Sequence, residues 1–321
     1  MTRADPGTFK SVERGNHEPK EKLAVVGATG YIGRKLTLEL LERGETVKAL
    51  ARSPEKAEDL REAGAEVVKV DVLEGSGMEE ALQDVSVAFY LVHSMGRGAL
   101  DNSYADRDKQ GGRNFGAAAK AAGVDLIVYL GGLSDGGSEH LESRHETAEI
   151  LEDSGVPVTY VRAAAVVGGG SESFLIPYYL VKRLPAMVTP RWARTKTQPI
   201  AIEDAVRYLA DIPGIEAAHG RELEIGCPDV TTYGGMMDAM ARAMNINPRP
   251  RIGVPVLSPG LSSHWIGLVT PVDVGVARPL IHGMEVETTV KDTSGMDLFD
   301  FEPMDIDKAM AAALKEMRAG K

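Results

Sequence analysis

Residues 27–33 read Gly-Ala-Thr-Gly-Tyr-Ile-Gly, and this short stretch decides the fold. The apolar run Leu23–Val26 comes directly before it. After it, the apolar side chains of residues 31–43 recur every four positions, and Gly44 follows where a helix C-cap is expected. This order predicts a buried strand, a glycine turn and an amphipathic helix, which together open a parallel α/β sheet.

Each glycine of the turn has its own role. Gly27 permits a tight turn, Gly30 lets the backbone approach a pyrophosphate, and Gly33 lets the helix pack closely on the strand. The start of the helix offers free N–H groups and a partial positive charge to phosphates. The turn therefore predicts a dinucleotide site, and a glycine turn that holds no ligand is the alternative. The residues expected to contact the cofactor here are Gly27, Thr29, Gly30, Tyr31, Ile32 and Gly33.

The end of the second strand, Thr46–Leu50, indicates the type of cofactor. An acidic residue at this place would bind the ribose 2′-OH of NAD. This chain has Arg52 instead, and a guanidinium can clamp a 2′-phosphate with two hydrogen bonds. We therefore expect NADP(H) as cofactor rather than NAD(H), with Arg34 as a second cation. A solvated surface role for Arg52 remains the alternative.

The alternation of apolar and amphipathic runs continues through the first half of the chain. Further strands are expected at residues 66–70, 87–92, 126–130, 158–161 and 221–225, and further helices at 106–122, 140–153, 203–210 and 305–318. The fold class predicted is α/β, with a Rossmann-type doubly wound parallel sheet.

The rhythm changes after Arg162, where Gly168-Gly169-Gly170 predicts a flexible break and most of the prolines follow. We expect the NAD(P)-binding domain to comprise residues 23–170 plus 198–226. Residues 171–197 plus 227–321 are expected to form a small irregular substrate subdomain over the carboxyl ends of the strands. Residues 1–22 are expected to form a disordered tail, because they are rich in charge, Gly and Pro.

Composition limits the possible partners. The net charge of −11 disfavours general binding of nucleic acid or anionic membrane. Cys227 is the only cysteine, which excludes an internal disulfide, and we expect it to be buried; no metal-ligand pattern occurs either. There is no signal-peptide core and no run of about 18 apolar residues, so we expect a cytoplasmic protein without a membrane span. The sequence is consistent with a monomer or with a homo-oligomer.

Together these stretches resemble the atypical and extended short-chain dehydrogenase/reductase superfamily, most closely its NmrA-like and NAD(P)-binding epimerase-like branches. The supporting stretches are residues 27–33, 51–54, 71–72, 128–134, 154–162 and 198–204. The resemblance implies a NADP(H) or NAD(H) pocket with Asp71 and Val72 beside the adenine.

The chain departs from that superfamily at the usual catalytic pair, Tyr-x-x-x-Lys. Counting back from Ser154-Gly155, the two places hold His140 and Arg144, while Ser134 lies where a catalytic Ser is expected. The residues are four apart and so share one face of a helix. His140 is then the candidate for proton transfer, with Arg144 as an anchor for ribose or an anionic substrate. A solvated, charged start of the helix is the competing interpretation.

Two further places are candidates. His93 follows the fourth strand, and ligands of doubly wound sheets lie outside the carboxyl ends of the strands, so His93 can face the cofactor or have a structural role. Asn114, on the following helix, is a candidate for shaping a proton path. A basic loop holds Arg191, Trp192 and Arg194, which either bind an anionic substrate and cover a ring or pack as an ordinary loop.

Two classes of function are consistent with these features. The first is an NADP(H)-dependent oxidoreductase, or an epimerase- or dehydratase-type enzyme, acting on a small molecule. The second is a non-catalytic dinucleotide-binding protein that serves as a redox sensor, regulator or assembly factor. The cofactor turn favours the first, and the missing Tyr-x-x-x-Lys favours the second. Fold alone does not choose between them.

Overall fold

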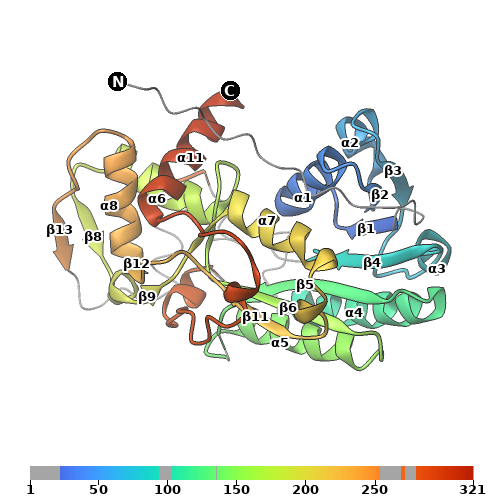
Figure 1. The fold of residues 1–321 in the computed structure, drawn as a ribbon. Coiled ribbons are helices and arrows are strands. Elements are labelled where there is room, and N and C mark those ends of the chain that lie inside the picture. The colour runs from blue at the N-terminus through green and yellow to red at the C-terminus, as the bar shows by residue number, and fades with distance from the viewer. Residues whose placement is uncertain (1–21, 94–102, 135, 254–268, 272–279, 321) are drawn as a thin grey trace, which may run out of the picture.

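A seven-stranded, wholly parallel sheet forms the centre of the protein (Figure 1). The computed structural model describes residues 22–93, 103–134, 136–253, 269–271 and 280–320. The strand order is β11-β6-β5-β4-β1-β2-β3. These strands are β1 (Lys22–Val26), β2 (Thr46–Ala51), β3 (Glu66–Lys69), β4 (Val85–Tyr90), β5 (Leu126–Gly132), β6 (Val158–Ala163) and β11 (Glu222–Ile225). The predicted Rossmann-type sheet is confirmed.

Helices cover both faces of this sheet. One face carries α1 (Tyr31–Glu42), α2 (Glu58–Glu62) and α7 (Ile202–Asp211), and the other carries α3 (Met78–Ala81), α4 (Ser103–Ala122) and α5 (Glu139–Glu152). A first hydrophobic cluster lies between the sheet and α1, α2 and α7, and a second lies between the sheet and α3, α4 and α5. Within β1, Leu23 and Val25 pack into the first cluster, while Ala24 and Val26 pack into the second. This alternation buries the strand on both faces, as parallel sheets require. Because β1 lies between β2 and β4, the strand order reverses beside it, and a ligand crevice is expected there.

A third hydrophobic cluster joins α6 (Glu172–Arg183), α8 (Tyr233–Ala243) and α11 (Ile306–Ala319). Short strand pairs lie beside these helices: β7 (Val166–Val167) with β10 (Ile200–Ala201), β8 (Met187–Thr189) with β13 (Arg251–Gly253), and β9 (Lys196–Thr197) with β12 (Thr231–Thr232). A helical turn is also described at residues 280–284. Single 3-10 turns connect several of the elements: η1 (Pro54–Lys56), η2 (Arg191–Arg194), η3 (Ile212–Gly214), η4 (Glu216–Ala218) and η5 (Met296–Leu298).

This part of the chain is more regular than its sequence suggested. Pro177 lies inside α6, and Gly234 and Gly235 lie in the first turn of α8, so neither helix has a clear local pattern. The hydroxyl of Thr232 accepts a hydrogen bond from the Gly235 N–H at 3.0 Å and caps α8. Burial of the apolar face in the third cluster outweighs the weak local propensity.

The Gly168-Gly169-Gly170 run is a point of close packing, so the expected flexible break was a wrong interpretation. A Cβ at Gly168 would collide with the Tyr31 hydroxyl, and one at Gly170 would lie 2.7 Å from the Tyr31 ring. A Cβ at Gly169 would lie 2.7 Å from the backbone nitrogen of Met317 in α11. Glycine is needed here because the cofactor turn and α11 both approach this backbone.

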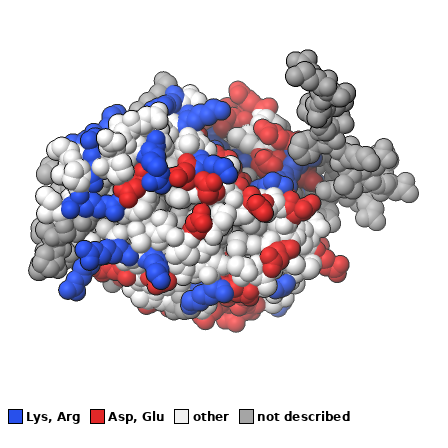
Figure 2. Space-filling model, turned by 60° about the vertical axis from the view of Figure 1, so that its left-hand side comes forward, with Lys and Arg blue, Asp and Glu red and all other residues white. Residues whose placement is uncertain are grey.

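Residues 1–21 of the expected tail lie outside the described residues, and Lys22 belongs to β1. Among the described residues, no helix is long and apolar enough to span a bilayer. Cys227 is buried and makes no disulfide, as expected. Figure 2 shows a face on which basic side chains spread over the left-hand part, so local positive surface exists on this acidic protein.

Candidate functional site

The glycine turn connects β1 to α1 with the geometry that a pyrophosphate requires. Gly27 has a φ of +87°, and a Cβ there would lie 2.9 Å from the Leu91 carbonyl oxygen at the end of β4. A Cβ at Gly33 would collide with the Gly27 carbonyl oxygen. Gly30 precedes α1 and has no side chain to cap it, so the first-turn N–H groups are left for an anion. These residues fit the phosphates of a dinucleotide.

A cavity of about 300 Å³ begins at this turn. Residues Gly30–Gly33 form one end, and the next part of the wall comes from the carboxyl ends of β5 and β6 and from residues that follow β4, β5 and β6. The far wall comes from the segment around α6, η2 and α8 and from residues 280–288. The cavity therefore joins the carboxyl edge of the sheet to the third hydrophobic cluster.

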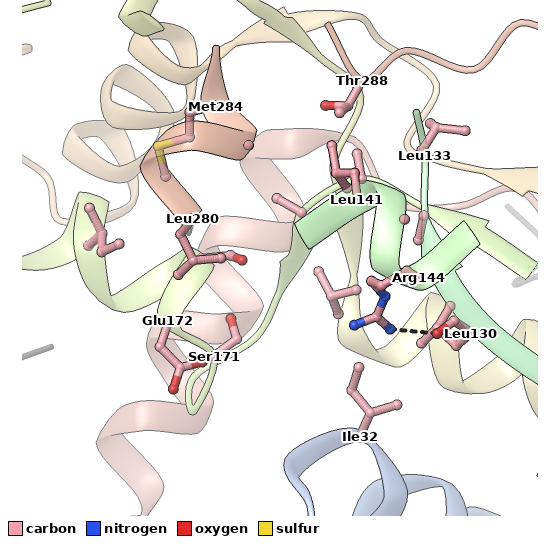
Figure 3. Close-up of a pocket in the computed structure, with 18 of the residues that line it drawn as sticks. Ile32, Leu130, Leu133, Leu141, Arg144, Ser171, Glu172, Leu280, Met284 and Thr288 are labelled. Carbon is pink, nitrogen blue, oxygen red and sulfur yellow. Dashed lines mark hydrogen bonds between the residues drawn. The ribbon is translucent and has the colours of Figure 1, made fainter. Parts of the chain in front are cut away.

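Arg144 of α5 is the main cation in this cavity. The side chain of Ser138 caps α5 by accepting a hydrogen bond from the Leu141 N–H at 3.3 Å. One turn later, Arg144 Nη2 donates to the Leu130 carbonyl oxygen at the end of β5, at 2.5 Å. Figure 3 shows the guanidinium between Leu130 and Ile32, across the cavity from Leu280. The Leu130 contact thus fixes a positive charge beside the cofactor turn.

His93 also lines the cavity, to which its side chain is open. Although the His93 side chain is exposed in the cavity, the protein atoms packed around it disfavour its charged form and lower the pKa of His93 to about 4, and the charge of Arg144 lowers it further in the same direction. His93 is therefore neutral at neutral pH, when it can donate or accept a hydrogen bond but is a poor source of a proton.

Tyr31 connects the cofactor turn to the last helix of the chain. Its hydroxyl donates to Glu316 Oε2 of α11 at 2.8 Å, and the Gly169 N–H donates to the same oxygen at 2.7 Å. Lys35 Nζ lies 2.7 Å from the other oxygen, Oε1. Burial would raise the pKa of Glu316, but these three partners lower it overall, so the carboxylate stays charged. Burial and Glu316 raise the pKa of Tyr31.

Sequence reasoning did not identify Glu316. The two residues of this contact are 285 positions apart, and Glu316 lies in an ordinary amphipathic helix. No local pattern marks it.

Ser134 and His140 are not placed in the cavity by the described structure. The Ser134 hydroxyl donates to the Gly136 carbonyl oxygen at 2.8 Å in the loop after β5, and Ser134 is not part of the cavity wall. His140 lies on α5, one turn before Arg144, but its side chain is outside the described residues. Its proposed role therefore stays a prediction.

The residues expected around the adenine end lie outside this cavity. Arg52 follows β2 with an exposed side chain. Asp71 Oδ1 accepts a hydrogen bond from the Leu73 N–H at 2.9 Å. Asn114 Nδ2 donates to the Val72 carbonyl oxygen at 2.8 Å, which gives Asn114 a structural role in the loop after β3.

Of the remaining candidate residues, only Trp192 lies in the described cavity wall. Arg34 pairs with Asp59 and donates to the Lys56 carbonyl oxygen at 2.6 Å. Within the basic loop, Arg191 and Arg194 are exposed and stay outside the cavity wall. Trp192 is buried in that wall, with its ring edge-on to Tyr233 at 6.3 Å between centroids.

Comparison with known proteins identifies a family and several relatives. The model of the NmrA-like family matches residues 19–212, which is more than half of the chain. Photosystem II assembly factor Ycf39 of Trieres chinensis is 28% identical over 172 residues, and the match spans 52% of each chain, so only about half of that relative is covered. Ceramide reductase of Caulobacter vibrioides is 26% identical over 270 residues, covering 81% of this chain and 84% of the relative.

Solved structures show the same fold. Triphenylmethane reductase of Citrobacter sp., complexed with NADP(H), superposes with a TM-score of 0.72 at 18% identity. The match covers 91% of this chain and 99% of that one. At this identity the similarity concerns the fold and leaves the chemistry to be argued from the site.

Proposed function

Because this chain belongs to the NmrA-like family, we propose that it is an NADP(H)-dependent oxidoreductase that acts on a small molecule. One observation carries the proposal: a single cavity runs from Gly30–Gly33 past His93 and Arg144 to the wall formed by α8. A dinucleotide on the turn and a second molecule against α8 would therefore meet beside Arg144.

The proposed cofactor contacts follow the sheet edge. The N–H groups at the start of α1 would hold the pyrophosphate, and Arg52 would bind the 2′-phosphate. Asp71 and Val72 would flank the adenine, as the family resemblance implies. His93 would lie toward the nicotinamide, which supplies a hydride when the cofactor is bound in its reduced form.

Arg144 would stabilise negative charge on the substrate. The contact with Leu130 orients the guanidinium before any substrate arrives, and preorganised charge is effective in a site that excludes water. A guanidinium stays protonated at any working pH, so Arg144 cannot act as the base. We assign proton transfer to His140, which lies one turn earlier on α5.

Relatives support reduction as the type of reaction. Ceramide reductase and triphenylmethane reductase carry that activity in their names. Other matched structures include a nucleoside-diphosphate-sugar epimerase of Staphylococcus aureus, which supports the epimerase-type alternative.

One observation favours a second, non-catalytic function. Both tyrosines of the described cavity wall are held in structural contacts: Tyr31 by Glu316, and Tyr233 by burial near the Thr288 and Thr197 hydroxyls, where burial raises its pKa. Neither is poised to replace the missing catalytic Tyr. A sensor or assembly factor would use the same turn without chemistry, and Ycf39 is named as an assembly factor.

Titration with NADPH, followed by NADPH consumption against quinones, aldehydes, ketones and enones, tests the proposal. We expect binding and turnover with at least one class. The variant Arg144→Met should lower turnover by about 10²-fold, the size of the loss when one oxyanion donor is removed. Arg113→Met, an exposed change on α4, is the matched control and should behave as the wild type.

The outcomes separate the two candidates. Tight binding of NADPH without consumption by any acceptor would support the sensor or assembly factor. Absence of NADPH binding would overturn both.

A further inference from the structure

The cavity wall opposite the cofactor turn is mostly apolar. It is formed by Met236 and Met237 of α8, by Leu280 and Met284 of the helical turn at residues 280–284, and by Ile176 of α6. In Figure 3, Leu280 and Met284 lie across the cavity from Arg144. Methionine side chains are flexible and polarisable, so such a wall adapts to apolar groups of different shape.

Charge in the described cavity wall is confined to a few places. Arg144 lies beside the turn, Glu172 lies at the start of α6, and His93 is neutral at neutral pH. The cations Arg191 and Arg194 project outward and contribute nothing to the wall. Among the described residues, the far wall offers no cation that could clamp a phosphate. Its polar side chains are few beside the apolar ones, so a buried ligand with many hydroxyl groups would lose water's hydrogen bonds there. They are Glu172, Trp192 and the hydroxyl-bearing Ser171, Ser173, Tyr233 and Thr288.

We infer that the substrate is a carbonyl compound with a bulky or long hydrocarbon part, which packs against the methionine wall while the carbonyl oxygen faces Arg144. This inference rests on the proposed function and specifies its substrate class. Nucleotide sugars and polyhydroxylated aldehydes are poor fits, because their phosphates and hydroxyls would lie unpaired against Met236, Met237 and Met284.

The reaction step follows from this placement. The carbonyl carbon accepts a hydride from the reduced nicotinamide, so a C–H bond forms while the π electrons of the C=O bond move to oxygen. Arg144 faces the developing alkoxide, which then takes one proton that solvent ultimately supplies. The carbonyl compound is reduced to an alcohol, and NADPH is oxidised to NADP⁺.

A homologous series of 2-alkanones, from acetone upward, tests the class at saturating NADPH. Each methylene buried against the wall should raise kcat/KM by about fourfold until the cavity is full. The kcat/KM for butanal should exceed that for erythrose by at least about tenfold. Erythrose has the same carbon skeleton as butanal but carries three hydroxyl groups. A flat series, or a preference for erythrose or for UDP-glucose, would overturn the apolar class.

A variant pair locates the effect on α8. Met237→Glu should abolish the dependence of kcat/KM on the chain length of the 2-alkanone, while the affinity for NADPH stays unchanged. Met244→Glu, at the end of the same helix and outside the wall, should keep the wild-type dependence. Met237→Leu should keep it as well, which covers the case in which the charged variant does not fold.

Binding separates failure of this inference from failure of the proposed function. If NADPH binds but no carbonyl compound oxidises it, the oxidoreductase proposal fails and the reduction step falls with it. The rise in melting temperature of the NADPH complex with 2-alkanones of growing length then decides whether the wall selects hydrocarbon. Equal shifts for acetone and 2-undecanone would overturn that part too.

Discussion

Arg144 shows how a single residue acquires a role from its surroundings. The same guanidinium on an open helix face would be solvated, but here its hydrogen bond to Leu130 holds it at the carboxyl edge of β5. His93, on the neighbouring strand end, faces the same cavity and feels this charge. Arg144 from α5 and His93 from the segment after β4 therefore bring two polar groups to the same end of the cavity.

At the residue scale, we propose that Arg52 makes the protein prefer NADP(H) to NAD(H). Its side chain is exposed directly after β2, at the place where a 2′-phosphate would lie. Arg52→Asp should weaken NADPH binding by at least about tenfold, because a hydrogen bond to a charged group contributes about 1.5–3 kcal/mol. Fluorescence titration with NADPH and NADH measures the change.

Arg61→Asp is the control for this prediction. Arg61 is an exposed cation of the nearby helix α2, and its substitution changes the net charge by the same amount. Equal affinity of the wild type for NADPH and NADH would contradict the role given to Arg52.

His140 carries the proposed proton transfer. His140→Phe should lower turnover by about 10²-fold or more and leave NADPH affinity intact, because general acid–base catalysis contributes roughly that factor. The pH profile of kcat should lose a limb near neutral pH in the variant. His282→Phe, an exposed change outside the cavity wall, should alter neither quantity, and unchanged turnover in His140→Phe would remove His140 from the mechanism.

At the scale of elements, α11 packs beside the cofactor turn and holds Tyr31 through a hydrogen bond to Glu316. It joins the third cluster through Met310 and Leu314, and it reaches the turn through Glu316. The backbone of Gly169 lies against Met317 and Ala313, so this helix docks only where the crossing backbone has no side chain. The run of three glycines is thus explained by the close approach of α1, through Tyr31, and of α11 to this stretch of backbone.

Gly169→Ala should undock α11. The new Cβ would meet backbone atoms of α11, which cannot move as a flexible side chain can. We expect a loss of about 1–3 kcal/mol in the free energy of unfolding, measured by urea titration. Gly214→Ala is matched to it, since a Cβ there meets nothing within 4 Å, and should change that free energy by less than about 1 kcal/mol. Equal effects of both variants would refute the docking role.

At the scale of the whole molecule, the low pKa of His93 in the cavity should make the free energy of unfolding depend on pH in the acid range. Since the pKa of His93 in the folded protein is about 4, below its usual value near 6.5, the unfolded chain binds this proton first. The free energy of unfolding should therefore fall as pH drops from about 6.5 to about 4. Urea titrations across this range should show a shallower fall in His93→Asn than in the wild type, while the exposed His282→Asn should follow the wild type. Identical profiles for all three proteins would contradict the shift.

Much of the architecture could be predicted from local patterns. The periodic apolar runs located the strands of the sheet and helices α1, α4, α5, α7 and α11 to within a few residues, and Gly27, Gly30 and Gly33 marked the turn. Helices α6 and α8 were not predicted, because Pro177 and Gly234-Gly235 mask their periodicity and tertiary burial stabilises them.

The sequence by itself determined the parallel sheet and its glycine turn, because strand burial, helix periodicity and the lack of a Cβ act between near neighbours in the chain. Only the tertiary structure brought Glu316 to Tyr31, turned Arg144 toward the turn, and set Leu280 and Met284 across from it. Such contacts depend on how whole elements pack, and residues 285 positions apart leave no common local signal. The chemistry of the cavity is therefore a property of the assembled fold.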